Sequence, residues 1–183
     1  KIVQNLINSC GMKYIIAEGE SDELCAAFVK NKKAYACMTE DSDLFVYGCE
    51  RVIKYVSLLN HTCIIYNLNK ILKNLNLTND DLQDIGILSG TDYNKEITGN
   101  IFKNKDYLLK FRENGDIQNT FLGWMKEKNF ICDEDYKKVL DIKNEYKIDE
   151  REILKNYPYM ILKNTDINYN KIKNILQPHG FVF

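Results

Sequence analysis

A short apolar, β-prone run that stops at a cluster of acids constrains the fold of this chain more than any other feature. The run covers residues 34–38 and is followed at once by Glu40-Asp41-Ser42-Asp43. Residues that close a buried strand of an α/β sheet lie at the edge where ligands bind. Side chains two apart in an extended segment point the same way, so Asp41 and Asp43 can converge. Taken alone, such a pair is more often a turn held by local side-chain to backbone bonds.

Strand-like and helix-like segments alternate up to about residue 95, which predicts an α/β domain with a mostly parallel sheet. The strands are expected at 13–17, 34–38, 51–56 and 63–66. The helices are expected at 2–9, around Leu24–Phe28, at 68–75 and at 78–88, the last with Thr78 as its cap. The strand signals fade beyond Asp92. Helices are predicted there at 104–112, 117–129, 133–144, 149–156 and 169–177, as a helical region on the same domain.

Composition narrows the class of protein. The chain has 183 residues, 45% of them hydrophobic and 28% charged, which suits one ordered, well-buried domain. No apolar run approaches the length that spans a bilayer, so no membrane partner is expected. Six cysteines without a Cys-x-x-Cys pair, and only two histidines, argue against a zinc site or an imidazole-based triad. Unpaired cysteines indicate a reducing compartment, nuclear or cytoplasmic.

Two further acidic sites join the first. Glu20 and Asp22 stand two apart before a predicted helix, and Asp92 follows a glycine after another one. The alternative for each site is a helix cap or a C-terminal turn. All three sites nevertheless fall at turns of one α/β unit, and five converging acids would be strongly destabilising without compensation. Divalent cations are the natural compensation, and hard oxygen ligands favour Mg²⁺ or Mn²⁺.

The net charge of −1 conceals an uneven distribution. Without the five acids, 25 basic residues stand against 21 acidic ones. Lys103, Lys105, Lys110 and Arg112 lie within ten residues, with only Asp106 of opposite charge. An acidic metal centre beside a lysine-rich helix is the layout of an enzyme that acts on a phosphodiester backbone. A solvated helix face would contain the same lysines.

Three segments, Tyr14–Ala27, Ala36–Gly48 and Ile85–Tyr93, resemble in order and spacing the internal region of the XPG / flap endonuclease family. These are structure-specific 5′ nucleases of replication and repair. The resemblance implies a PIN-like (Rossmann-like) core over residues 1–95, with helices on both faces of the sheet and incomplete without an upstream half. It also implies a helical C-terminal region over 96–183 that contains a degenerate helix-turn-helix.

The same resemblance implies two Mg²⁺ ions, for which Mn²⁺ can substitute. Glu20 and Asp22 would hold one ion together with upstream aspartates, and Asp41, Asp43 and Asp92 would hold the second. Two such ions orient a water and stabilise the leaving oxygen of an in-line displacement. The expected partners are 5′-flap, branched or nicked duplex DNA and the upstream half of the same nuclease.

Two departures from the family pattern concern the acids and the turn after them. Asp22 stands where the family often has Glu, although the flanking residues favour the register of Glu20 and Asp22 over that of Glu18 and Glu20. The family's Gly-Ile-Gly turn, which binds duplex backbone and K⁺, is degenerate near 97–103. Only Gly99 remains, which makes K⁺ binding doubtful. Lys103 and Lys105 stay as expected phosphate contacts.

Other interpretations remain open. A 5′ exoribonuclease would use the same carboxylates, because metal ligands do not distinguish deoxyribose from ribose. A non-catalytic DNA-binding relative would keep the fold without the activity. A Mg²⁺ phosphohydrolase of small substrates lacks its usual nucleophilic aspartate here. The last residues, Asn168–Phe181, resemble a helix that returns to the nuclease core, and no sliding-clamp motif is indicated. Abundant Lys, Asn and Ile are typical of an AT-rich genome, such as that of a large DNA virus or a protist.

Overall fold

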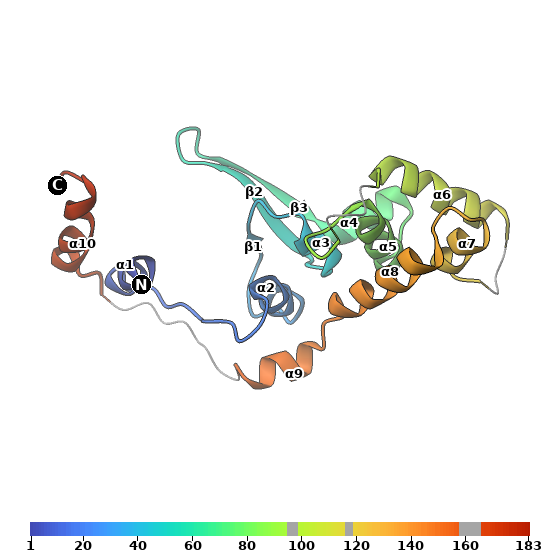
Figure 1. The fold of residues 1–183 in the computed structure, drawn as a ribbon. Coiled ribbons are helices and arrows are strands. Elements are labelled where there is room, and N and C mark those ends of the chain that lie inside the picture. Colours follow the sequence, from blue (N-terminus) through green and yellow to red (C-terminus); the bar gives the residue numbers. More distant parts are fainter. Residues whose placement is uncertain (95–98, 116–118, 158–165) are drawn as a thin grey trace. The chain divides into compact units, whose positions relative to one another are not determined.

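The computed structural model describes residues 1–94, 99–115, 119–157 and 166–183 in two units. One unit combines Lys1–Gly19 with Lys155–Phe183, and the other is Glu20–Leu154 (Figure 1). Each is considered by itself. Among the helices of the described ranges, none is both long enough and apolar enough to cross a membrane.

The smaller unit pairs the two ends of the chain. Helix α1 (Ile2–Ser9) lies against α10 (Tyr169–Leu176), which continues into the 3₁₀ turn η1 (Gln177–His179). The amide of Asn168 donates to the carbonyl of Ser9 at 2.8 Å and so ties the start of α10 to the end of α1.

The strand predicted at 13–17 is wrong, because this segment has no regular structure. A strand needs a neighbour that satisfies its backbone groups. Here a side chain takes part of that role: the hydroxyl of Tyr157 contacts the carbonyl of Ile16 at 3.4 Å and accepts from the amide of Glu18 at 3.1 Å.

The larger unit contains a mixed, three-stranded sheet of order β1-β2-β3, formed by β1 (Cys37–Met38), β2 (Arg51–Ser57) and β3 (Thr62–Asn67). Strand β1 is parallel to β2, whereas β2 and β3 are antiparallel. The prediction of a mostly parallel sheet is therefore wrong for the described residues. Only residues 58–61 separate β2 from β3, and a parallel crossover needs a dozen residues or more.

Strand β1 is shorter than the predicted 34–38 because backbone amides just before it bond to the end of helix α2 (Ser21–Lys30). The amides of Lys33 and Ala34 both donate to the carbonyl of Phe28, at 2.9 and 3.1 Å, and close the end of that helix. The β2–β3 hairpin also bends. Its register shifts between Lys54 and Ser57, around the positive φ of Tyr55.

The predicted helices are confirmed as α1, α2, α4 (Leu68–Leu75), α5 (Asn79–Ser89), α6 (Ile101–Glu113), α7 (Phe121–Glu127), α8 (Asp133–Glu145), α9 (Glu150–Lys155) and α10. The short helix α3 (Asp43–Val46) was not predicted; it begins in the turn expected at Asp41–Asp43. Thr78 caps α5 as predicted, in a reciprocal capping box with Asp81. Helix α7 begins after the cap Thr120, later than the predicted residue 117, which lies outside the described residues.

Helices α3, α5 and α8 pack together and set the position of the acidic turns. Leu44 of α3, Ile85 of α5 and Val139 of α8 are buried in one hydrophobic cluster. An ion pair joins the last two helices, with Lys143 Nζ 2.5 Å from Asp84 Oδ1. Asp43 begins α3 and Asp92 follows α5, so this packing fixes where the side chains of these two acids start.

Candidate metal centre

The turn after β1 holds two of the predicted acids. Asp41 Oδ1 accepts from the amide of Asp43 at 2.8 Å, and Thr39 Oγ1 accepts from the amide of Asp41 at 3.0 Å. The turn is therefore held by local side-chain to backbone hydrogen bonds, as the alternative interpretation expects. These local bonds leave other carboxylate oxygens for longer-range contacts. Asp43 Oδ2 accepts from the hydroxyl of Tyr146 at 2.7 Å and lies 3.5 Å from the amide of Asp92.

Glu20 and Asp22 lie at the start of α2. Glu20 is the N-cap residue, with an extended backbone, but in the described structure its side chain makes no capping hydrogen bond. Asp22 lies in the first turn, where its charge suits the helix dipole. The alternative of a simple cap thus fails for the side chain of Glu20, whose carboxylate is exposed.

Asp92 lies in a rigid turn that follows α5. Gly90 has a φ of +102°, which a residue with a side chain rarely adopts. Asn94, 1% exposed, then accepts from the amide and the hydroxyl of Thr91 at 2.6 and 2.7 Å, and donates to the carbonyl of Ile87 at 2.5 Å. A single buried amide therefore holds the backbone on both sides of Asp92.

The electrostatics link all five acids. Burial raises the pKa of Asp22, and the charges of the other four acids raise it further: Asp41, Asp43, Glu20 and Asp92. Burial likewise raises the pKa of Asp43, although the hydrogen bonds from Tyr146 and from the Asp92 amide lower it. Carboxylates that raise one another's pKa lie within electrostatic reach of each other.

The donor set fits a hard divalent cation by its chemistry, because all five groups are carboxylates. The five carboxylates lie further apart than the ligands of a complete coordination shell. Across the ranges that the structure describes, no three His, Cys, Asp or Glu side chains come close enough to hold one ion together. The fold thus gathers the predicted ligands without closing them around a point.

A tyrosine cluster beneath the acids was missed by the sequence reasoning. The ring of Tyr146 lies 4.6 Å from that of Tyr47 and 5.3 Å from that of Tyr93, measured between centroids, and the hydroxyls of Tyr47 and Tyr93 are 3.0 Å apart. Burial raises the pKa of Tyr47 and of Tyr146 above the usual range, so both remain neutral hydrogen-bonding groups. Tyr146 is 103 positions from Asp43, and no local pattern could connect them.

A buried lysine also lies beside the site. Lys54, on the inward face of β2, donates to Ser42 Oγ at 2.9 Å, between the two aspartates of the turn. The alternation of buried positions in β2 contains a signal for this residue, because Val52 and Lys54 share a face.

The predicted DNA-binding residues lie at the start of α6. Asn100 caps this helix by accepting from the amides of Phe102 and Lys103, so the latter part of the predicted 97–103 turn is helical; residues 97 and 98 lie outside the described residues. Gly99 has no room for a side chain, since a Cβ there would come within 1.9 Å of the carbonyl of Leu88. This packing requires a glycine whether or not DNA approaches.

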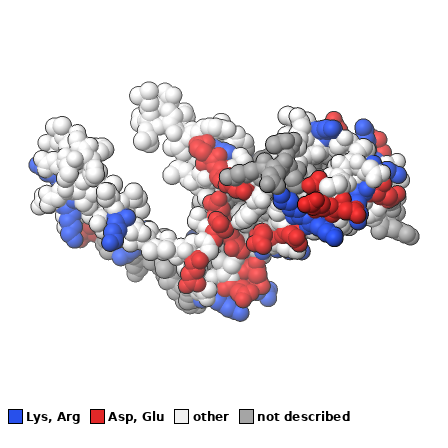
Figure 2. Space-filling model, in the orientation of Figure 1, with Lys and Arg blue, Asp and Glu red and all other residues white. Residues whose placement is uncertain are grey.

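The lysines of α6 are available to solvent. Lys103 and Lys110 both hold their ammonium groups over the ring of Tyr107, at 5.6 and 5.8 Å, while Lys105 is half-buried. Figure 2 shows acidic side chains gathered over the middle of the larger unit, whereas lysine and arginine side chains are mixed with acidic ones over α6 to α8. Helix α6 itself has a basic excess, with Lys103, Lys105, Lys110 and Arg112 against Asp106 and Glu113.

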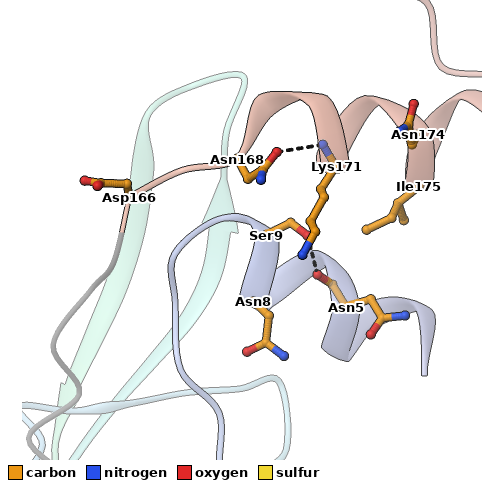
Figure 3. Close-up of a pocket in the computed structure, with 8 residues that line it drawn as sticks. All are labelled: Asn5, Asn8, Ser9, Asp166, Asn168, Lys171, Asn174 and Ile175. Atoms are coloured by element: carbon orange, nitrogen blue, oxygen red, sulfur yellow. Dashed lines mark hydrogen bonds between the residues drawn. The ribbon is translucent and has the colours of Figure 1, made fainter.

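One pocket of the smaller unit is separate from the acids. It is an open hollow of about 610 Å³ between α1 and α10 (Figure 3). Its lining is polar apart from Ile175 and consists of Asn5, Asn8, Ser9, Asp166, Asn168, Lys171, Asn174 and Ile175. None of the predicted site residues belongs to this lining.

Comparisons with known proteins identify the family of this fold. Residues 11–92 match the XPG I-region. Flap endonuclease 1 of Methanococcus aeolicus is 33% identical over 131 residues, which cover 64% of this chain and 40% of the relative. Flap endonuclease 1 of Methanocaldococcus jannaschii is 27% identical over 178 residues, 94% of this chain and 53% of the relative.

Solved structures agree in fold. The catalytic core of Rad2 in complex with DNA substrate matches with a TM-score of 0.73 at 19% identity, over 97% of this chain and 61% of that one. Flap endonuclease-1 from Methanococcus jannaschii matches with a TM-score of 0.60 at 22% identity, over 96% and 57%. The chain belongs to the XPG / flap endonuclease family. It spans about half, or less, of the length of the curated relatives described above.

Proposed function

We propose that this chain is part of a metal-dependent 5′ nuclease of the flap endonuclease or 5′-3′ exonuclease type. Its substrates are branched or 5′-ended DNA, and its reaction is phosphodiester hydrolysis during replication, repair or recombination. The observation that carries the proposal is the shared electrostatic field of the acids, in which four other carboxylates raise the pKa of Asp22. A fold with no use for cations has no reason to keep five such groups within reach of one another.

Each acid has a proposed role as a metal ligand. Glu20 and Asp22 hold one Mg²⁺, and Asp41, Asp43 and Asp92 hold the second. Bound Mg²⁺ or Mn²⁺ supplies an activated water and stabilises the leaving oxygen. Closing the open arrangement of the acids needs additional ligands, and we propose that an upstream half of the same nuclease contributes them. The core then becomes the PIN-like fold with helices on both faces of its sheet.

The DNA-binding part of the proposal rests on α6. Its amino-terminal turn carries Lys103 and Lys105, and Gly99 precedes it. Lysine ammonium groups bind phosphates as point charges, without reading sequence. The Rad2 core that shares this fold is described with a DNA substrate, which supports a duplex or branched DNA as partner. The proposed location is the nucleus or cytoplasm.

Cleavage of a 5′-flap DNA in Mg²⁺ tests the proposal. Asp41→Asn and Asp92→Asn each remove a ligand charge while keeping size, and each is expected to lower the cleavage rate by at least about a hundredfold, with DNA binding largely intact. Asp133→Asn, an exposed acid on α8, is the matched control and is expected to cut like the wild type. Near wild-type cleavage by either site variant contradicts the assignment.

The same experiment separates the alternatives. An RNA flap of the same sequence is included as a second substrate, and preferential cleavage of it favours the 5′ exoribonuclease. Tight DNA binding by a wild-type protein that cuts neither substrate, with Mg²⁺ or with Mn²⁺, favours the non-catalytic relative.

A further inference from the structure

Tyr146 brings a hydrogen-bond donor from the helical region to an acid of the metal centre. It is the C-cap residue of α8, is 2% exposed and donates from its hydroxyl to Asp43 Oδ2 at 2.7 Å. This is a contact between parts of the chain 103 positions apart, and it aims at one particular carboxylate oxygen.

We propose that Tyr146 is a positioning residue for the metal centre, which fixes the orientation of the Asp43 carboxylate. The inference rests on the proposed function, since it assigns Asp43 to a metal ion. Tyr146 touches neither DNA nor a reacting atom in this role; it acts through Asp43.

The direction of the hydroxyl is fixed by the packing of its ring. Tyr47 lies against it in a tilted arrangement with a centroid distance of 4.6 Å, and Tyr93 contacts it edge-on at 5.3 Å. Both neighbours are themselves joined through their hydroxyls at 3.0 Å. The ring cannot turn away without disturbing the other two, so the donor is held in place before any ligand arrives.

A neutral donor is the right kind of group for this position. A hydroxyl occupies one acceptor site of a carboxylate and leaves the others for a cation, since an ionised carboxylate has about four lone-pair sites. An ammonium group in the same place would repel the cation. The nearby Lys54 instead donates to Ser42.

The contact also links Asp43 to helix α8, which provides Tyr146, and so to α5, which precedes Asp92. Helix α8 is held to α5 by the ion pair of Lys143 and Asp84, and Asp92 follows directly after α5. The carboxylate of Asp43 receives Tyr146 from one of these helices and approaches the Asp92 amide at the end of the other. Outer partners of this kind commonly change metal affinity by about 10- to 100-fold.

Tyr146→Phe tests the inference because it deletes the hydroxyl and keeps the ring. The Mn²⁺ dissociation constant, from electron paramagnetic resonance of the free ion, is expected to rise about tenfold. The Mg²⁺ concentration for half-maximal cleavage is expected to rise by a similar factor, with a smaller change in kcat. Tyr136→Phe is the matched control: Tyr136 lies on the same helix α8, but its ring contacts Lys126 and not the tyrosine cluster. Its Mn²⁺ constant is expected to stay within about twofold of the wild type.

The outcomes separate this inference from the proposed function. Asp43→Asn is included, and loss of Mn²⁺ binding in it supports the centre itself. If the wild type binds, Asp43→Asn does not, and Tyr146→Phe binds like the wild type, the positioning role is overturned while the function stands. These measurements use the nuclease with its upstream half present, since that half is proposed to complete the site. If this wild type fails to bind Mn²⁺, or Asp43→Asn binds normally, both fail.

A folding defect is distinguished from a loss of metal binding by the melting temperature of each variant, measured without metal. If Tyr146→Phe does not fold, 2,3-difluorotyrosine at position 146 replaces it, because this residue keeps the shape and alters the strength of the hydrogen bond. An unchanged Mn²⁺ constant in that protein also overturns the inference.

Discussion

Asp22, a proposed metal ligand, illustrates how a single acid can lower the stability of its own fold. Burial and four neighbouring carboxylates raise its pKa, so its charged form is less favourable in the folded chain than in the unfolded one. We predict that Asp22→Asn stabilises the metal-free protein at pH 7 by about 0.5–1 kcal/mol. Urea unfolding in a chelator measures this difference.

The pH dependence of the Asp22→Asn gain follows from the direction of the shift. The folded-state pKa lies above the ordinary value of 3.8, so the wild type takes up a proton more readily when folded. Its deficit is fully present above the folded-state pKa, shrinks as the pH falls through it, and is absent below the unfolded value. The variant's advantage is therefore expected at pH 7 and not at pH 3.

A matched control for Asp22→Asn lies at the same position of another helix. Asp80 is the second residue of α5, as Asp22 is of α2, but belongs to no acidic cluster of the site. Asp80→Asn loses its interaction with the helix dipole, against which only the relief of its repulsion of Asp84 counts, and is expected to destabilise by about 0.3–1 kcal/mol. If the two variants shift stability in the same direction and amount, the repulsion at the site is not felt by the fold.

Individual site residues were predictable only where a local pattern marks them. The five acids stand at the ends of apolar segments with a spacing of two or behind a glycine, and these patterns are visible in sequence. Tyr146 is a tyrosine at the end of an ordinary amphipathic helix. Its role depends on where α8 packs against α5, which is a tertiary contact and leaves no trace in the neighbouring residues.

At the scale of elements, the α5–α8 pair depends on a buried ion pair. Asp84 is 6% exposed, and burial raises its pKa while Lys143 lowers it. We predict that Lys143→Met destabilises the protein by about 3 kcal/mol at pH 7, because the variant leaves an uncompensated buried charge. The loss is expected to shrink in acid, where Asp84 takes up a proton. Urea unfolding at pH 7 and pH 4 measures both effects.

The double variant distinguishes the cost of breaking the pair from the value of the pair. Asp84→Leu with Lys143→Met replaces both charges by apolar groups and is expected to lie within about 1 kcal/mol of the wild type. A double variant as unstable as Lys143→Met alone would show that the helices separate for a reason other than the unpaired carboxylate.

Helices and strands differed in how well the sequence predicted them, because helices are determined by nearby residues and strands by distant partners. Helix α5 begins where Thr78 and Asp81 cap it and ends at Gly90, all within one short stretch. Strands depend on partners. The run at 13–17 lacks a neighbouring strand among the described residues. The alternation of strands and helices predicts a parallel sheet, but the connection 58–61 is too short for a parallel crossover and makes β2 and β3 antiparallel.

At the scale of the molecule, the distribution of charge matters more than its sum of −1. A chain with that net charge has no general attraction for a polyanion, so binding of DNA has to come from a local concentration of lysines. Helix α6 provides one, with Lys103 and Lys110 on the side that carries Tyr107. In the proposed function, the acids around α2 repel phosphate until cations neutralise them, so we expect DNA binding at the acidic site to depend on metal and binding at α6 not to.

The salt dependence of DNA binding tests this division between the two regions. We predict that Lys103→Ala weakens binding to flap DNAs of different sequence by a similar factor and reduces the slope of log K against log salt by about one. Ca²⁺ is used in the assay so that binding is measured without cleavage. Lys137→Ala, an exposed lysine of α8, is the control and is expected to leave the slope unchanged. Equal slopes for the wild type and Lys103→Ala would remove Lys103 from the interface and shift the DNA path away from the start of α6.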